Sequence, residues 1–369
     1  MRIALVHDWL KNISGAERVL IELHEIFPEA PIYTLFYDKR FVRQWLPNAD
    51  IRASFIQKIP FINKLYLFFG WLMPTAIESF DLSEFNKVLS SSAVFSKGLI
   101  LKPSTKHICY CYSPTRFLWD RNRNFQSRRF GRLPDPLASG WLKLIFNHLL
   151  RLWDRAAADR VDQYVAISNT VRDRIKKYYR RDSMVIYPPA GIKNQNFKIE
   201  NLKFKIGEYY LIVSRLHRYK NINIAIEAFN KLNYPLVIIG DGPDRRRLEK
   251  MAGKSITFLG EQDDSTLADY YAACRAFIMP QEEDFGLTPI EAMSFGKPVI
   301  ALRKGGALET IIEGQTGEFF DDPIPEALAD AVRRLNDNYY DYNPNKIKSQ
   351  AAQFSREIFK QKIIALINQ

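Results

Sequence analysis

The sequence predicts an α/β protein made of two halves, each a doubly wound parallel sheet with helices on both faces. Three observations favour this fold class. The chain has 369 residues, which is too long for one core of usual size and suits two domains. Short apolar runs alternate with helical patterns twice along the chain. A polar tract rich in Asn and Lys, which follows residues 187–191 and runs to 205, is typical of a linker between the two series.

Composition is that of a soluble globular protein, with 47% hydrophobic and 25% charged residues. The three cysteines, Cys109, Cys111 and Cys274, make no disulfide framework, and a reduced cytosolic setting is the default. The first apolar run meets His7 and Asp8 too early for a signal peptide. The longest run, 65–73, is far shorter than the roughly 20 residues that span a bilayer. We therefore expect a cytoplasmic protein that is at most peripheral at a membrane.

The positive charge is concentrated in the N-terminal half. The net charge is +12; residues 1–194 contain 30 Lys and Arg against 17 Asp and Glu, whereas the rest of the chain contains 23 against 24. This asymmetry indicates an anionic partner for the N-terminal half: a membrane surface, a lipid-linked pyrophosphate or nucleic acid.

The N-terminal half opens with a strand at 2–6, and Gly15 begins a helix with apolar residues at helical spacing. The loop between them, which contains Asp8, lies at the carboxyl edge of the sheet, where open α/β folds bind ligands. Helices are expected at 137–161, the first half of which should pack inward, and at 169–179. Further strands are expected at 31–37, 51–55, 86–92, 106–112, 164–167 and 184–187.

Two segments of this half have two interpretations each. The aromatic segment 59–76, which contains Lys64, is either a core helix under the sheet or an amphipathic segment that faces a membrane or acceptor. The arginine-rich segment 116–132 is either a solvated loop or a site for an anionic acceptor or headgroup, because arginine forks suit phosphate oxygens. The candidate acceptor or membrane residues are Arg116, Arg121, Arg123 and Lys64.

The C-terminal half alternates in the same way. Strands are expected at 209–213, 236–239, 256–259, 276–279 and 298–302, and helices from 222, at 265–273, at 287–295 and from 305–306. Pro289 lies in the first turn of the third helix, where a missing N–H costs nothing, and Gly296 ends it. The tail 345–369 has a helical pattern.

Charged side chains gather beside these strand ends. Glu283 and Glu291 flank the junction at Gly286, where the amides of a helix start could bind an anion. One site could then hold a diphosphate on the amides and sugar hydroxyls on the carboxylates. Arg215 and Lys220 follow the strand at 209–213. Taken alone, two glutamates at this spacing are more often a solvated loop residue and a surface helix residue.

The stretch 280–310 resembles the E-x7-E signature of family-4 retaining glycosyltransferases, with F-G-L, E-A-M, G-K-P-V-I and G-G-A-L-E-T in order. The resemblance implies the GT-B fold, in which two Rossmann-like domains face a cleft. The N-terminal, acceptor-binding domain would comprise residues 1–192 with about 345–369, and the C-terminal, nucleotide-sugar-binding domain residues 193–344.

The resemblance also implies residue roles. Glu283 would contact the donor sugar, Glu291 the ribose, and Arg215 and Lys220 the diphosphate. Tyr112 stands where the family typically carries a His that meets the donor sugar. The donor-binding residues implied are Gly15, Tyr112, Gly260, Gln262, Phe285, Gly286, Leu287, Thr288 and Glu291.

Sugar transfer requires stabilisation of charge on the departing nucleoside diphosphate. The sequence has neither a D-x-D nor a His/Cys cluster with ligand spacing, so we expect a metal-independent clamp made by Arg215, Lys220 and helix starts, without a cofactor. Glu283 completes the candidate catalytic set by its position. Asp8 either orients or deprotonates the acceptor hydroxyl or caps its own loop.

The expected activity is retaining transfer of a hexose from GDP-mannose or UDP-glucose. The phrases H-D-W and Y-C-Y-S-P-T-R-F-L-W-D resemble bacterial enzymes of this family, so we expect a glycan or lipid-linked acceptor in surface polysaccharide biosynthesis. The enzyme would bind peripherally to the anionic inner membrane and would not bind nucleic acid. The alternatives are a basic nucleic-acid-binding protein and an inactive nucleotide-sugar-binding relative.

Overall fold

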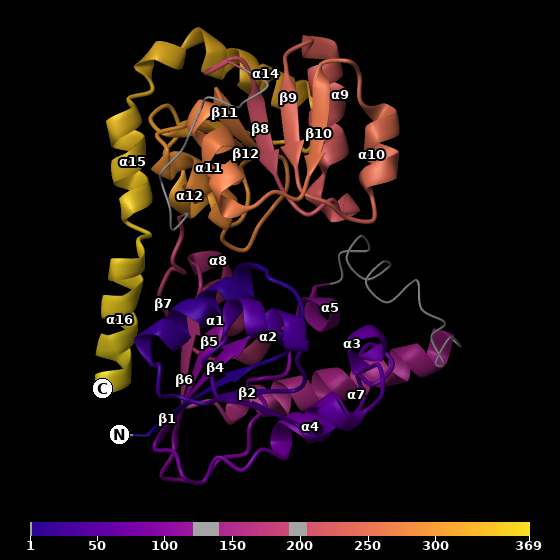
Figure 1. Cartoon of the computed structure of the whole chain (residues 1–369), viewed down its shortest axis with the longest axis vertical. Helices are drawn as coiled ribbons and strands as arrows, with labels where there is room; N and C mark the ends of the chain where they lie inside the picture. Colours follow the sequence, from indigo (N-terminus) through magenta and orange to yellow (C-terminus); the bar gives the residue numbers. More distant parts are fainter. Residues whose placement is uncertain (1, 121–139, 192–204) are drawn as a thin grey trace. The chain divides into compact units, whose positions relative to one another are not determined.

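The structure is a computed structural model that describes residues 2–120, 140–191 and 205–369. The chain divides into two compact units, Met1–Pro188 with Phe359–Gln369, and Pro189–Ile358. Each unit is built around one parallel sheet with helices on both faces (Figure 1). The fold class predicted from the sequence is therefore confirmed.

The sheet of the N-terminal unit has the strand order β3-β2-β1-β4-β5-β6-β7, and all of its pairs are parallel. The strands are β1 (Ile3–His7), β2 (Ile32–Thr34), β3 (Ile51–Ala53), β4 (Lys87–Ser92), β5 (Lys106–Cys111), β6 (Gln163–Ala166) and β7 (Ser183–Val185). After their first residues, β1, β4 and β5 are buried throughout, as expected for central strands covered on both faces. The order of connection reverses between β1 and β4, which makes this pair the switch point of the sheet.

The helices of this unit are α1 (Gly15–Ile26), α2 (Lys39–Trp45), α3 (Ile62–Leu65), α4 (Met73–Glu78), α5 (Arg116–Trp119), α7 (Gly140–Asp159), α8 (Asn169–Tyr179) and most of α16 (Arg356–Asn368). Although α16 ends the chain, it belongs here: the ring of Phe359 meets the ring of Tyr110 edge-on at 5.8 Å, and the ammonium of Lys87 donates to the carbonyl of Ile367.

The aromatic segment 59–76 fits both of its interpretations in part. Ile62, Met73 and Ala76 are buried in the core cluster under the sheet. Phe61 and Trp71, in the same segment, are 75% and 56% exposed. The segment therefore contributes to the core on one side and presents aromatic rings to solvent on the other.

The expectation that the first half of the helix at 137–161 packs inward is wrong. In α7, the side chains of Trp141, Leu144 and Leu149 are more than half exposed, while Phe146 and Leu150 pack against the core cluster. Apolar residues around most of a helix usually indicate burial. Here one stripe of the helix packs against the core cluster, and the opposite stripe is exposed.

The sheet of the C-terminal unit has the order β10-β9-β8-β11-β12-β13 and is also parallel. Its strands are β8 (Tyr210–Val213), β9 (Leu236–Ile239), β10 (Ile256–Gly260), β11 (Ala276–Met279), β12 (Val299–Leu302) and β13 (Gly317–Phe320). Its helices are α9 (Ile222–Leu232), α10 (Arg245–Met251), α11 (Asp264–Ala273), α12 (Leu287–Ser294), α13 (Ala307–Thr310), α14 (Pro325–Asp337) and α15 (Pro344–Ala352). The switch point of this sheet lies between β8 and β11.

Helix α12 begins and ends where its sequence signals place it. Gly286 precedes it with a φ of 91°, a conformation that favours glycine. At its end, the amide of Gly296 donates to the carbonyl of Met293 (2.8 Å) and that of Lys297 to Ala292 (3.2 Å), so two terminal carbonyls of the helix are satisfied.

Candidate active site

The carboxyl ends of β8 and β11 flank the switch point of the C-terminal sheet. Arg215 and Lys220 lie in the loop after β8, and Glu283 lies in the loop after β11. Chain connections leave such a point in opposite directions, so loops from two neighbouring strands surround the place where open parallel sheets bind ligands. Topology therefore explains why residues more than sixty positions apart meet.

Lys220 and Glu283 form an ion pair between the Lys Nζ and the Glu Oε1. Gln281, in the same loop as Glu283, donates from its Nε2 to the same oxygen at 3.0 Å. The two charged side chains are 12% and 22% exposed, so they are mostly buried but keep some exposure to solvent. The structure thus brings together two residues of the predicted catalytic set.

Two glycines hold the Glu283 loop against the loop after β12. Residues 283 and 305 form an isolated parallel bridge, and the amide of Gly306 donates to the carbonyl of Glu283 at 2.9 Å. A Cβ atom on Gly305 would lie 2.2 Å from the Glu283 carbonyl oxygen, and one on Gly306 would lie 2.3 Å from that of Phe285. Only glycine allows this approach, which fixes the backbone that carries Glu283.

Helix α12 begins four residues after Glu283, at the end of the same loop. The helix starts at Leu287 and Thr288 without a side-chain cap. The first amides of a helix have no intrahelical partner and carry the positive end of its dipole. An anion at this end would therefore gain both hydrogen bonds and electrostatic stabilisation.

Glu291 lies one turn further along α12 and is buried. The hydroxyl of Tyr271, on α11, donates to its Oε2 at 2.9 Å. Sequence reasoning missed Tyr271, because no spacing or motif connects it to Glu291. Its hydrogen bond still leaves lone pairs on the carboxylate for a ligand hydroxyl.

The remaining predicted donor-binding residues of this unit each have different local contacts. The carbonyl of Gly260 accepts from the amide of Gly240 (2.7 Å), at the end of β9. Gln262 donates from Nε2 to the carbonyl of Leu259 (2.8 Å). Phe285 is buried edge-on against Phe354 at 5.6 Å, so it supports the loop. Arg215 is exposed and forms no ion pair within the described ranges.

The N-terminal switch point is organised differently, around Asp8. Its Oδ2 accepts from the amides of residues 93 and 94 (2.8 and 2.9 Å), and its Oδ1 from those of residues 95 and 96 (both 2.7 Å). The side chain is 2% exposed. Both oxygens are thus occupied by the loop that follows β4. This environment matches the second role considered for Asp8, a cap for a loop.

A closed set of polar contacts surrounds the start of α1, beside Gly15. The Tyr112 hydroxyl donates to the carbonyl of Ala16 (3.0 Å) and shares a hydrogen bond with Ser91 Oγ (2.8 Å). Because Tyr112 has a single proton, Ser91 donates to it and then accepts from His7 Nδ1 (3.1 Å). The Nδ1 atom of His7 therefore carries a proton.

Glu17 completes this set. Its Oε1 lies 3.7 Å from His7 Nε2, and the hydroxyl of Ser14 donates to its Oε2. Burial acts to raise the pKa of Glu17, but the hydrogen bonds and charge of His7 and the Ser14 hydroxyl outweigh it, so the pKa is lowered. The sequence phrase S-G-A-E contained this residue, but nothing in it marked the Glu as part of a site.

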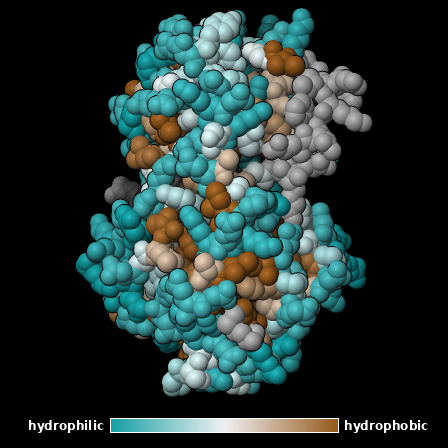
Figure 2. Space-filling view, turned by 90° about the vertical axis from the view of Figure 1, so that its left-hand side faces the viewer, coloured by the Kyte–Doolittle hydropathy of each residue, from teal (hydrophilic) through white to brown (hydrophobic). Residues whose placement is uncertain are grey.

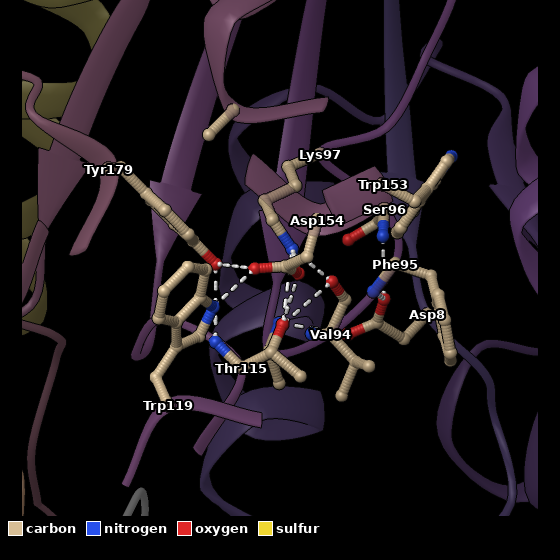
Figure 3. A network of polar contacts seen from close by, with 12 residues as sticks. Asp8, Val94, Phe95, Ser96, Lys97, Thr115, Trp119, Trp153, Asp154 and Tyr179 are labelled. Carbon is tan, nitrogen blue, oxygen red and sulfur yellow. Dashed lines mark hydrogen bonds and ion pairs between the residues drawn. The ribbon is translucent and has the colours of Figure 1, made fainter. Parts of the chain in front are cut away.

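A buried ion pair between Lys97 and Asp154 holds the helices around this edge (Figure 3). The Lys Nζ lies 2.6 Å from Asp154 Oδ1, and the side chains are 2% and 1% exposed. Asp154 also accepts from the hydroxyls of Thr115 (2.6 Å) and Tyr179 (2.8 Å) and from Trp119 Nε1 (2.7 Å). The pair thus joins the loop after β4 to α5, α7 and α8, and sequence analysis did not identify it.

Two of the four candidate acceptor residues lie among the described residues. Arg116 begins α5, and its guanidinium lies 3.6 Å from Asp120. Lys64 is exposed on α3. Arg121 and Arg123 lie outside the described residues. The two described cations, Arg116 and Lys64, therefore lie on different helices.

The described residues contain neither a cluster of metal-ligating side chains nor a membrane-spanning helix. No group of three or more His, Cys, Asp or Glu side chains is placed to bind a metal ion there. Nor does any helix in the described ranges have the length and apolar character needed to cross a membrane.

Comparison with known proteins indicates the class of enzyme. The family described as "Glycosyl transferases group 1" matches residues 193–354, which include every candidate donor residue of the C-terminal unit. Alpha-1,3/1,6-mannosyltransferase ALG2 of Candida glabrata is 25% identical and aligns over 98% of this chain and 91% of its own length. This protein is a glycosyltransferase.

Other relatives of the glycosyltransferase agree with this assignment. D-rhamnosyltransferase WbpZ of Pseudomonas aeruginosa is 28% identical over 47% of this chain and 50% of its own length. The structure of Anabaena Alr3699/HepE in complex with UDP superposes with a TM-score of 0.72 at 17% identity, covering 100% of both chains. The glycosyltransferase therefore has the GT-B fold, as predicted.

Proposed function

We propose that this enzyme transfers a hexose from a nucleoside-diphosphate sugar to a glycan or lipid-linked acceptor, with retention of configuration and without a metal ion. The observation that carries the proposal is the meeting of Lys220 and Glu283 at the switch point of the C-terminal sheet. A cation for a phosphate and a carboxylate for sugar hydroxyls are both needed to bind such a donor.

The proposed donor site uses residues of the C-terminal unit. Lys220 and the exposed Arg215 bind the diphosphate together with the amides of Leu287 and Thr288. Glu283 binds sugar hydroxyls, and Glu291 binds the ribose. As the glycosidic bond breaks, negative charge grows on the departing diphosphate, and fixed cations with a helix dipole stabilise it without a metal. The residues of the N-terminal unit that we propose for donor binding are Gly15 and Tyr112.

GDP-mannose and UDP-glucose are the two donors proposed. The relatives that align over most of this chain are named mannosyltransferases, which favours the first. A structural neighbour with UDP-glucose supports the second. The acceptor is proposed to belong to bacterial surface polysaccharide biosynthesis and to be presented at the inner membrane, since the basic residues are concentrated in the N-terminal half.

The test is a transfer assay with each donor, a lipid-pyrophosphate-linked sugar acceptor, and either Mg²⁺ or EDTA. We expect product with one donor at similar rates under both conditions, and NMR of the product should show the anomeric configuration of the donor. Loss of activity in EDTA would contradict the metal-free clamp, and an inverted product would contradict retention. Salt-sensitive binding of an oligonucleotide without turnover of either donor would favour the nucleic-acid-binding alternative.

A further inference from the structure

We propose that the outward face of α7 is the surface by which this protein binds an anionic lipid membrane. The residues of this face are Trp141, Leu144, Ile145, Leu149 and Leu152, with exposed fractions of 63%, 68%, 48%, 57% and 56%. We refer to them as the α7 stripe. The inference deepens the proposed function, because a membrane would present the lipid-linked acceptor, but it concerns binding and can be tested without turnover.

Helix geometry places these five side chains together. Residues three or four positions apart share one face of a helix, and 141, 144, 145, 149 and 152 follow that spacing. The opposite face of α7 packs inward through Phe146, Leu150 and Trp153. A helix that is apolar on both sides cannot bury both against one sheet, so the stripe stays exposed.

The rotation of α7 about its axis is fixed. Asp154, the residue after Trp153, is held by Lys97 inside the unit (Figure 3). Trp153 donates from Nε1 to Glu78 Oε1 on α4 at 2.8 Å. Turning the stripe inward would break both contacts and leave a buried charge without its partner, which is costly. The stripe is therefore a permanent feature of the folded unit.

Aromatic rings from the preceding segment add to this surface. Trp71 lies two residues before α4, which contacts α7 through the Trp153–Glu78 hydrogen bond. Trp71 is 56% exposed, and Phe61 of the same segment is 75% exposed. Tryptophan favours the boundary between lipid headgroups and acyl chains, because its ring is apolar and its N–H is polar.

The charged residues near the α7 stripe indicate which partner binds it. The segments 55–77 and 140–153 contain no Asp or Glu, and their charged residues are Lys58, Lys64, Lys143 and Arg151. Apolar residues in segments whose own charged side chains are all cationic fit an anionic lipid surface. A second copy of this chain would instead bring the same positive charges together, which opposes a dimer through this face.

The C-terminal unit provides a matched control. Leu308 and Ile324 are 54% and 46% exposed, similar to residues of the stripe. Acidic residues lie beside them in the sequence: Glu309 follows Leu308, and Asp321 and Asp322 precede Ile324. Replacing these two residues removes a comparable amount of exposed apolar surface in a setting that an anionic membrane would repel.

The experiment is sedimentation of the full chain with vesicles of phosphatidylcholine alone, or with about one third phosphatidylglycerol. We expect the wild type to bind the anionic vesicles, and Leu144→Ser combined with Leu149→Ser to weaken that binding about tenfold. Leu308→Ser combined with Ile324→Ser should bind as the wild type does. Because all four residues are exposed, thermal midpoints should be unchanged. Leu152→Ser alone provides a second, milder test of the stripe.

Three results would overturn the proposal. The wild type could fail to bind anionic vesicles, the stripe variants could bind as well as the control, or gel filtration could show a dimer that the stripe variants dissociate. Donor hydrolysis in vesicle-free buffer is measured in parallel. If the stripe variants retain hydrolysis while losing vesicle binding, the docking surface and the proposed donor chemistry are separated. If hydrolysis is absent in the wild type but vesicle binding follows the stripe, only the proposed function fails.

Discussion

The two sheets of this protein have the same topology at their switch points but use them differently. Between β1 and β4, the carboxylate of Asp8 is buried and accepts four backbone amides from the neighbouring loop. Between β8 and β11, Lys220 and Glu283 face each other with 12% and 22% of their side chains exposed. The carboxylate at the first switch point is fully occupied by backbone amides of its own chain, whereas the second switch point is spanned by an ion pair that keeps some exposure to solvent.

The difference has an energetic basis. A buried carboxylate with four amide donors is costly to disturb, because each amide would lose a charge-assisted hydrogen bond. The Lys220–Glu283 pair keeps some exposure to solvent, so we expect a diphosphate, which carries more negative charge, to replace Glu283 as the partner of Lys220. This comparison predicts that substitutions at the C-terminal switch point impair ligand binding and catalysis, while substitutions at the N-terminal one impair folding.

The largest expected effect is that of Lys220→Ala on turnover. We expect kcat to fall about 100-fold or more, because a fixed charge on the leaving group is lost, while the thermal midpoint changes little. The matched control is Lys231→Ala, which removes an exposed lysine paired with Glu326 at 2.6 Å in the same unit. Turnover of the Lys220 variant equal to that of the control would remove Lys220 from the clamp.

Asp154→Ala should strongly destabilise the N-terminal unit. The substitution leaves Lys97 buried without its counter-charge, which costs about 3–5 kcal/mol in the free energy of unfolding. Urea denaturation followed by intrinsic fluorescence measures this loss. Asp159→Ala, which breaks an exposed pair with Arg155, should cost under about 1 kcal/mol. Similar losses for the two variants would show that the buried network is not a stabilising unit.

Asp8→Asn distinguishes a loop cap from a base. The amide side chain would place N–H groups against backbone donors, so we expect a loss of about 2–3 kcal/mol in the free energy of unfolding. Donor affinity should be retained in the protein that remains folded. A variant with unchanged stability and a large fall in kcat would instead assign Asp8 to the chemistry.

Sequence signatures account for more of the contacts at the C-terminal switch point than at the N-terminal one, for a physical reason. The site around Glu283 depends on backbone features that have sequence signatures, namely Gly286 before a helix and Gly305 and Gly306 where two loops touch. Three contacts join residues that are distant in the sequence or belong to no motif, so only the folded chain brings them together. These contacts are Lys97 with Asp154, Tyr271 with Glu291, and His7 with Glu17. The α7 stripe was mispredicted because apolar content does not reveal which side of a helix meets the sheet.

The smallest expected effect concerns Glu17, whose pKa is lowered by its partners against the effect of burial. A carboxyl whose pKa is lowered by folding binds its proton less readily in the folded state than in the unfolded state. It therefore stabilises the fold above its ordinary pKa, near 4.5. That contribution is lost as the pH falls through the pKa of the folded state. Glu17→Gln should therefore be less stable than wild type by about 1 kcal/mol at neutral pH. The two curves should converge in acid; a constant difference across this range would contradict the pairing with His7.

The most direct measurement is a calorimetric titration of GDP and UDP, and of guanosine and uridine, into the wild type and the double variant Arg215→Ala, Lys220→Ala. If the C-terminal switch point binds a diphosphate, one nucleoside diphosphate will bind the wild type at least about tenfold more tightly than its nucleoside. The double variant will lose that preference while it stays folded. A double variant that keeps the preference, or a wild type that binds nucleoside and nucleoside diphosphate equally, would contradict this assignment of the site.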